Sequence, residues 1–76
     1  MSLTEIVAQN LFAAREEKKL TQAELARKAK VSVSYISMLE RGERTPPLET
    51  LETLAKALGM RPLDLLEKRA ARRARR

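Results

Sequence analysis

Residues 21–42, TQAELARKAKVSVSYISMLERG, contain two short amphipathic segments joined by a turn of about three residues. Thr21 is the expected N-cap of the first segment, and Glu24, three positions later, completes the pattern of a capping box. Ser32 is the expected N-cap of the second segment. Gly42 is the residue type that commonly ends a helix in the left-handed conformation. The stretch therefore predicts a short helix, a tight turn and a second short helix.

Apolar residues flank both predicted caps. Leu20 and Leu25 occupy the two positions of a hydrophobic staple around the first cap, and Val31 and Ile36 occupy the same positions around the second. Two helices joined in this way are typical of a helix-turn-helix DNA-binding unit. The remaining sequence should then supply the helices that support such a unit.

Apolar periodicity predicts five helices, over residues 3–18, 22–29, 33–41, 47–58 and from Pro62 onward. Gly59 is expected to end the fourth helix. No stretch alternates with period two, so we expect an all-α bundle without a sheet. The predicted inward positions are Leu3, Val7, Leu11, Ala14, Ala23, Leu25, Ala26, Ala29, Ile36, Leu39, Leu48, Leu51, Leu54, Ala55 and Leu58, and Leu63, Leu65 and Leu66 follow in the fifth helix.

The composition excludes several kinds of chemistry. A chain of 76 residues is expected to form one domain, and it contains no cysteine and no histidine. Disulfides, thiolate nucleophiles and the commonest metal ligands are therefore absent, and no carboxylates cluster at inward helix positions. We expect no enzymatic activity, no metal site and no cofactor.

No apolar run approaches the length of about 20 residues that spans a bilayer, and no signal-peptide core follows Met1. The absence of cysteine fits a reducing compartment. The sequence therefore predicts a cytoplasmic protein without a membrane partner.

The positive charge is confined to one end of the chain. The net charge is +6, yet residues 1–67 hold equal numbers of basic and acidic side chains, whereas residues 68–76, KRAARRARR, hold six basic and no acidic ones. We therefore divide the chain into a domain at 1–67 and a basic tail at 68–76. The tail either extends the fifth helix or forms a disordered arm, and in both cases it is expected to attract phosphate.

One face of the predicted third helix is a candidate for contacting DNA. If this helix enters a major groove, side chains opposite Ile36 and Leu39 meet base edges, together with the cap residue Ser32. Serine tolerates several bases, whereas valine and methionine make only apolar contacts, best with a thymine methyl. The alternative is that the two apolar side chains pack on a neighbouring helix. The residues of this face are Val33, Ser34, Ser37, Met38 and Arg41.

Four side chains carry less specific hypotheses. Tyr35 either reaches a phosphate or base, or packs half-buried. Gln22 lies at a helix start, where backbone N–H groups attract phosphate, and is otherwise an ordinary exposed residue. Arg41 and Arg44 flank the loop after the third helix and either clamp the DNA backbone or are simply solvated.

Arg15 and Glu40 are expected to form an ion pair. Each neighbours a core position, Ala14 and Leu39 respectively, so the two side chains can meet between the first and third helices. Such a pair would align the third helix, and losing one partner would leave a buried charge uncompensated.

The sequence resembles the Cro/C1-type (XRE-like) helix-turn-helix family over roughly residues 6–66. The resemblance rests on LTQAELA at 20–26, VSVSYISMLERGER at 31–44 and PPLETLETLAKALG at 46–59. It implies a compact five-helix bundle of the lambda-repressor-like type, whose third helix recognises DNA, and a homodimer on a palindromic operator. By position, it implies DNA contacts from Gln22, Ser32, Val33, Ser34, Tyr35, Ser37, Met38 and Arg44.

The chain departs from the family pattern at two places. Lys30 stands where the turn often has Gly or Asn, and a lysine held at positive φ would cost about 1 kcal/mol. Apart from Arg41 at its end, the candidate face also lacks the Gln, Asn or Arg that make bidentate base contacts. We therefore expect DNA recognition to depend more on phosphate contacts and DNA shape than on direct contacts to bases.

Within the family, the short chain resembles stand-alone regulators such as restriction–modification controllers and small phage repressors. Dimerisation would use the fourth and fifth helices, with Leu63, Leu65 and Leu66 as candidates that must also help close the core. No small-molecule ligand is implied. Two alternatives remain: an antitoxin that binds both a toxin and its own promoter, and a helical module that binds only proteins.

Overall fold

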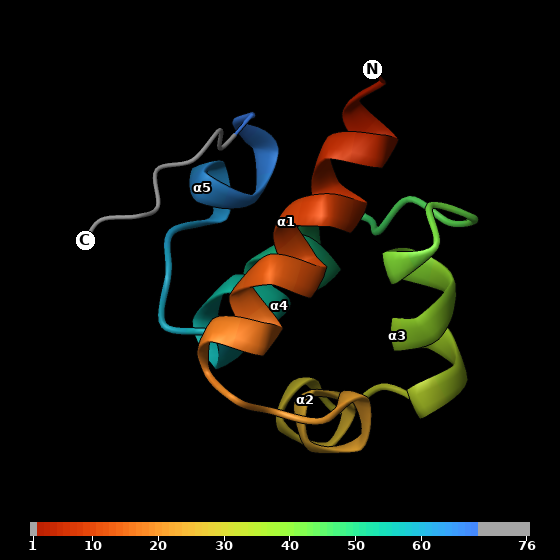
Figure 1. Ribbon diagram of the computed structural model, residues 1–76, viewed down its shortest axis with the longest axis vertical. Helices are drawn as coiled ribbons and strands as arrows, with labels where there is room; N and C mark the ends of the chain where they lie inside the picture. Colours follow the sequence, from red (N-terminus) through yellow and green to blue (C-terminus); the bar gives the residue numbers. More distant parts are fainter. Residues whose placement is uncertain (1, 69–76) are drawn as a thin grey trace.

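The computed structural model describes residues 2–68, and within them the chain forms five helices and no strand (Figure 1). The predicted all-α class and the predicted number of helices are therefore confirmed for this part of the chain. Met1 and residues 69–76 lie outside the described residues, and most of the predicted basic tail lies there with them. The helices are α1 (Leu3–Glu17), α2 (Gln22–Ala29), α3 (Val33–Glu40), α4 (Leu48–Ala57) and α5 (Pro62–Leu66).

The predicted caps start α2 and α3. The Thr21 hydroxyl accepts a hydrogen bond of 3.0 Å from the backbone N–H of Glu24, and the Glu24 carboxylate accepts one of 2.8 Å from the N–H of Thr21. These contacts lower the pKa of Glu24. The Ser32 hydroxyl accepts from the N–H of Tyr35 at 3.0 Å. Each cap satisfies a helix-start donor that the helix itself leaves unpaired.

The helix-turn-helix turn contains a lysine in the left-handed conformation. Lys30 has φ 61° and ψ 42°, so the cost considered for a lysine at positive φ applies to this turn. Gly42, with φ 75°, and Gly59, with φ 70°, follow α3 and α4 as the sequence predicted. Lys19, with φ 58°, is a second left-handed lysine that the sequence did not predict.

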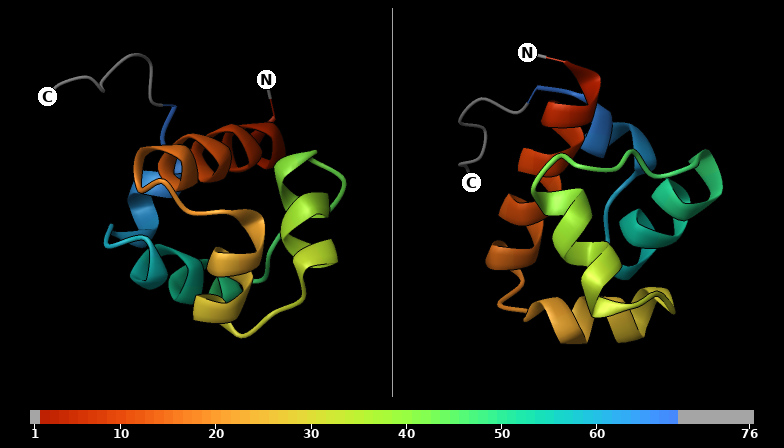
Figure 2. Two further views of the ribbon diagram at one scale, coloured as in Figure 1. Left: turned by 60° about the horizontal axis from the view of Figure 1, so that its bottom comes forward. Right: turned by 90° about the vertical axis from the view of Figure 1, so that its right-hand side faces the viewer.

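A single apolar core holds the five helices together. α1 packs against both α3 and α5, while α2 packs against α3 and α4. Figures 1 and 2 show α5 and α3 on opposite sides of α1, so the last described helix lies away from α3. The largest fully buried side chains are Leu11, Leu25, Ile36, Leu39, Leu54, Leu58 and Leu65.

Three predicted inward residues are exposed instead. Leu3 and Leu48 are the first residues of α1 and α4, and Ala23 is the second residue of α2. Side chains of a helix lean toward its N-terminus, so at the first positions they point past the helix start and miss the core. Leu48 is 76% exposed for this reason.

α5 does not continue into the tail without a break. Helix geometry ends at Leu66, and Glu67 has the extended backbone angles φ −93° and ψ 139°. Glu67 therefore interrupts the helix before the tail begins. The part of the tail prediction that concerns residues 69–76 lies outside the described residues.

Residues 2–68 contain neither a membrane-spanning helix nor a cluster of possible metal ligands. No helix there is both long and apolar enough to cross a bilayer. Nor do three or more His, Cys, Asp or Glu side chains of these residues gather where they could hold a metal ion.

Candidate nucleic-acid interface

The two sides of α3 have opposite surroundings. Ile36 and Leu39 are fully buried in the core. On the other side, Val33 is 46% exposed, so nearly half of its surface faces solvent. We call this side the outer face of α3; its residues are Ser32, Val33, Ser34, Ser37, Met38 and Arg41, of which Ser37 and Met38 are partly buried and the others exposed.

Tyr35 belongs to neither face completely. Its side chain is partly buried and packs against the apolar core. Of the two alternatives that the sequence left open, the structure favours packing, and Tyr35 thereby helps to seat α3 on the domain.

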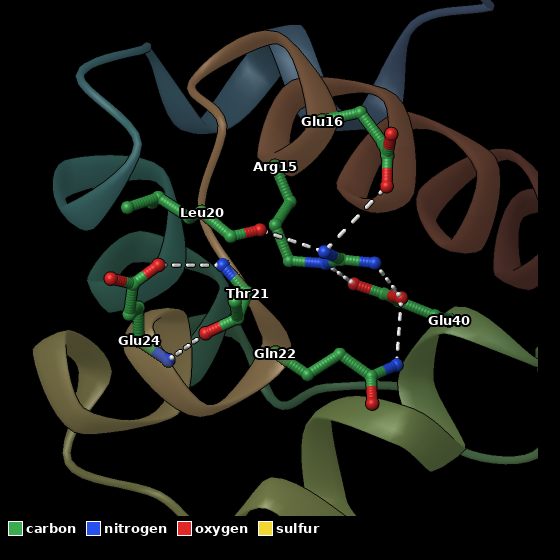
Figure 3. A network of polar contacts seen from close by, with 7 residues as sticks. All are labelled: Arg15, Glu16, Leu20, Thr21, Gln22, Glu24 and Glu40. Atoms are coloured by element: carbon green, nitrogen blue, oxygen red, sulfur yellow. Dashed lines mark hydrogen bonds and ion pairs between the residues drawn. The ribbon is translucent and has the colours of Figure 1, made fainter.

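A buried ion pair fixes α3 against α1, as predicted (Figure 3). Arg15 donates from Nε to Glu40 Oε2 at 2.6 Å and from Nη2 to Glu40 Oε1 at 3.0 Å, and both side chains are more than nine-tenths buried. The third nitrogen, Nη1, donates to the carbonyl oxygen of Leu20 at 2.8 Å, and the guanidinium lies 5.3 Å from the ring centroid of Phe12. The hydrogen bond to Glu40 raises the pKa of Arg15. The network therefore ties α1, α3 and the segment before α2 together.

Gln22 also joins this network. Its Nε2 donates to Oε1 of Glu40 at 3.0 Å, and Figure 3 shows its amide oxygen pointing away from that carboxylate. The sequence suggested either a phosphate contact or an ordinary exposed residue, and did not foresee a bond to Glu40. Because this bond joins the first residue of α2 to the last of α3, it sets the position of the two helices relative to each other.

Arg41 is paired at the end of α3. Its Nε lies 2.9 Å from Oε2 of Glu43, its Nη2 lies 3.1 Å from Oε1 of the same carboxylate, and its Nη1 donates to Oγ of Ser37. These contacts raise the pKa of Arg41 and lower that of Glu43. Glu43 was not singled out from the sequence, although the opposite charges at positions 41 and 43 are a local signal for such a pair. Arg44 is exposed next to the pair, and within residues 2–68 it forms no ion pair.

The three candidate leucines for dimerisation have different surroundings. Leu65 is completely buried in the core, so its assignment to a dimer surface is wrong: its side chain packs inside the domain. Leu66 is partly buried against the same core. Leu63 is 61% exposed and is the one of the three whose side chain is mostly free to contact another molecule.

Comparison with known proteins gives a consistent result. The family model described as "Helix-turn-helix" matches residues 11–66. The immunity repressor protein of Bacillus phage phi105 is 50% identical over 54 residues, which cover 71% of this chain and 38% of the repressor. An uncharacterized HTH-type transcriptional regulator of Sinorhizobium fredii, y4dJ, is 41% identical over 66 residues, covering 87% of this chain and 86% of that protein.

A solved structure extends the likeness to three dimensions. The restriction–modification controller protein C.Esp1396I, crystallised as a tetramer in complex with its natural 35-base-pair operator, superposes with a TM-score of 0.78. The sequences are 31% identical, and the match covers 86% of each chain.

Proposed function

We propose that the chain is a sequence-specific DNA-binding transcriptional regulator, because it belongs to the Cro/C1-type helix-turn-helix family. It acts as a homodimer on a palindromic operator, with α3 lying in the major groove of each half-site. The proposal assigns no catalytic role to the chain.

The observation that carries the proposal is the outer face of α3. This face presents hydroxyl and apolar groups to solvent, while the opposite side of the helix is held by the core and by Glu40. A helix that is exposed on one side and rigidly seated on the other is suited to the major groove, which admits one α-helix. The helix in this position is the second of the helix-turn-helix pair, the one that contacts bases in such units.

The chemistry of this face predicts what it prefers. Val33 and Met38 offer only apolar surface, which fits thymine methyl groups, and the hydroxyls of Ser34 and Ser37 can donate or accept. No side chain of the face is of the type that binds adenine bidentately. We therefore assign much of the specificity to DNA shape and much of the affinity to phosphate contacts.

A homodimer would double the small set of base contacts that one outer face can make. The domain measures 29 × 25 × 19 Å, and the two half-sites of such an operator lie about 34 Å apart. Leu63 of α5 is the apolar side chain that we assign to the contact between copies. C.Esp1396I, a relative of similar size, forms a tetramer on its operator, and this supports the proposal that the present chain also assembles on DNA.

Selection of bound duplexes from a random DNA pool tests the proposal. We expect enrichment of a palindrome with thymines at the positions under Val33 and Met38. Enrichment of no sequence would contradict the proposal and favour a module that binds only proteins. Enrichment of a single, non-repeated half-site would remove the homodimer and leave DNA binding.

The basic tail is proposed to add attraction for phosphate. The tail follows α5, which lies on the side of α1 opposite α3 (Figures 1 and 2). Deleting residues 68–76 is expected to weaken binding and to flatten its dependence on salt, by about 0.9 in the slope for each phosphate that the tail neutralises. Measuring affinity across a salt series checks this, and an unchanged slope would remove the tail from the interface.

A further inference from the structure

α5 is a very short helix with few anchors of its own. It has five residues, far fewer than a helix needs to persist alone in water, so its position depends on what holds it to the domain. Leu65 fills the core on its inner side. The other strong anchor is polar and comes from α1.

That anchor is the side-chain amide of Asn10, which is only 4% exposed. Its Nδ2 lies 2.7 Å from the carbonyl oxygen of Glu67 and 2.9 Å from that of Leu65. The carbonyl oxygen of Asp64, at 3.3 Å, is the third acceptor. Carbonyl oxygens only accept hydrogen bonds, so the group that faces them must be the NH₂. The amide therefore caps carbonyl groups that the end of a helix leaves unpaired.

We infer that Asn10 is a positioning residue for the homodimer: its amide fixes the end of α5 on α1 and so holds Leu63 where a second copy contacts it. The inference rests on the proposed function, because it concerns the surface assigned there to dimerisation. Leu63 lies within the five residues of α5, whereas α2 and α3 make no hydrogen bond to Asn10 among the described residues. Loss of the amide donor is therefore expected to loosen α5 and spare the DNA-contacting helices.

The substitution Asn10→Asp isolates the donor. It keeps the size of the side chain but places a carboxylate, which cannot donate, against three carbonyl oxygens. Gln9→Glu is the matched control, since it makes the same amide-to-carboxylate change on the exposed neighbouring position of α1.

Sedimentation of the full chain measures dimer dissociation, and NMR follows the backbone amides of α5 and of α2–α3 in each variant. We expect the dimer dissociation constant of Asn10→Asp to rise by about tenfold or more, because buried acceptors lose their donor. The amide signals of residues 63–67 should shift while those of α2 and α3 stay in place. Affinity for a single half-site duplex, taken from the selected palindrome, should match that of Gln9→Glu.

Three results would overturn the inference. They are a dissociation constant equal to that of the control, a shift of α2 and α3 as large as that of α5, and loss of half-site binding. If Asn10→Asp does not fold, Asn10→Ala removes the donor without adding charge, and unfolding of that variant as well overturns the inference. A wild-type chain that is monomeric and binds no duplex would instead remove the proposed function itself.

Discussion

The inner and outer faces of α3 show how differently a single short helix can be constrained. On the inner face, Ile36 and Leu39 are fully buried, and Glu40 accepts hydrogen bonds from Arg15 and Gln22. Most side chains of the outer face are exposed to solvent, and the ion pair between Arg41 and Glu43 at its end is exposed as well. One set of residues thus holds α3 in place, and another set is exposed and free to contact DNA.

In this domain, the residues that fix the position of α3 are therefore different from those that would set its preference for a DNA sequence. Changes on the inner face should act on stability, and on DNA binding only through stability. Changes on the outer face should act on DNA binding and leave the fold intact. Four sets of substitutions test that separation, beginning with the largest expected effect.

The ion pair should give the largest loss. Arg15→Ala and Glu40→Ala should each lower the free energy of unfolding by about 3–5 kcal/mol, because each leaves the other charge buried without its partner. The pair of Arg61 and Asp64, at 2.8 Å, is the matched control, and Arg61→Ala should lower stability far less, because the Arg61 side chain is exposed to solvent. Denaturant unfolding of the single and double variants measures the coupling. A coupling near zero between Arg15 and Glu40 would show that the pair does not fix α3.

Truncation of an apolar residue on the inner face should cause the second largest loss of stability. Leu39→Ala leaves a cavity in the core and should cost about 2–5 kcal/mol of stability. Val33→Ala on the outer face of the same helix should change stability by no more than about 0.5 kcal/mol. Thermal or denaturant unfolding gives both values. Equal losses at the two positions would break the distinction between the faces.

Arg44→Ala tests the loop that follows α3 beside the outer face. The exposed guanidinium is expected to contact a phosphate, so its removal should weaken binding to all duplexes alike and lower the salt slope by about 0.9. Stability should not change, because Arg44 has no ion-pair partner within residues 2–68. Fluorescence anisotropy at several salt concentrations checks this. A weakening confined to one base pair would instead assign Arg44 to base recognition.

The smallest effect is expected in the turn between the two helices. Lys30→Gly should raise the free energy of unfolding by up to about 1 kcal/mol, since glycine adopts the observed φ of 61° without a clash of its own side chain. Lys30→Ala is the control that removes the charge and keeps the strain, and it should not stabilise the protein. A gain of the same size in the alanine variant would assign the effect to charge.

Sequence was most informative where the determinants are local. The caps at Thr21 and Ser32 bond to residues three positions away, so their pattern alone predicted where α2 and α3 start. The first-turn leucines were misassigned because periodicity does not show where a helix start lies relative to its neighbours. Leu65 was assigned to two uses, and burial in the assembled core leaves it only one.

Asn10 illustrates the limit of the sequence most clearly. Its acceptors lie 54 to 57 positions away, so no local pattern announces the contact. One signal was present: Asn10 falls among Val7, Leu11 and Ala14 on the apolar stripe of α1, where a polar residue needs a buried partner. The identity of that partner required the fold.

The separation of the two faces is tested most directly by titrating the protein with the selected duplex and following its methyl signals by NMR. Val33 and Met38 report on the outer face, and Ile36 and Leu39 report on the inner face of the same helix. We predict large shifts for the first two and small shifts for the second two. Unmoved signals of Val33 and Met38 in a saturated complex would contradict the assignment of the outer face of α3 to DNA.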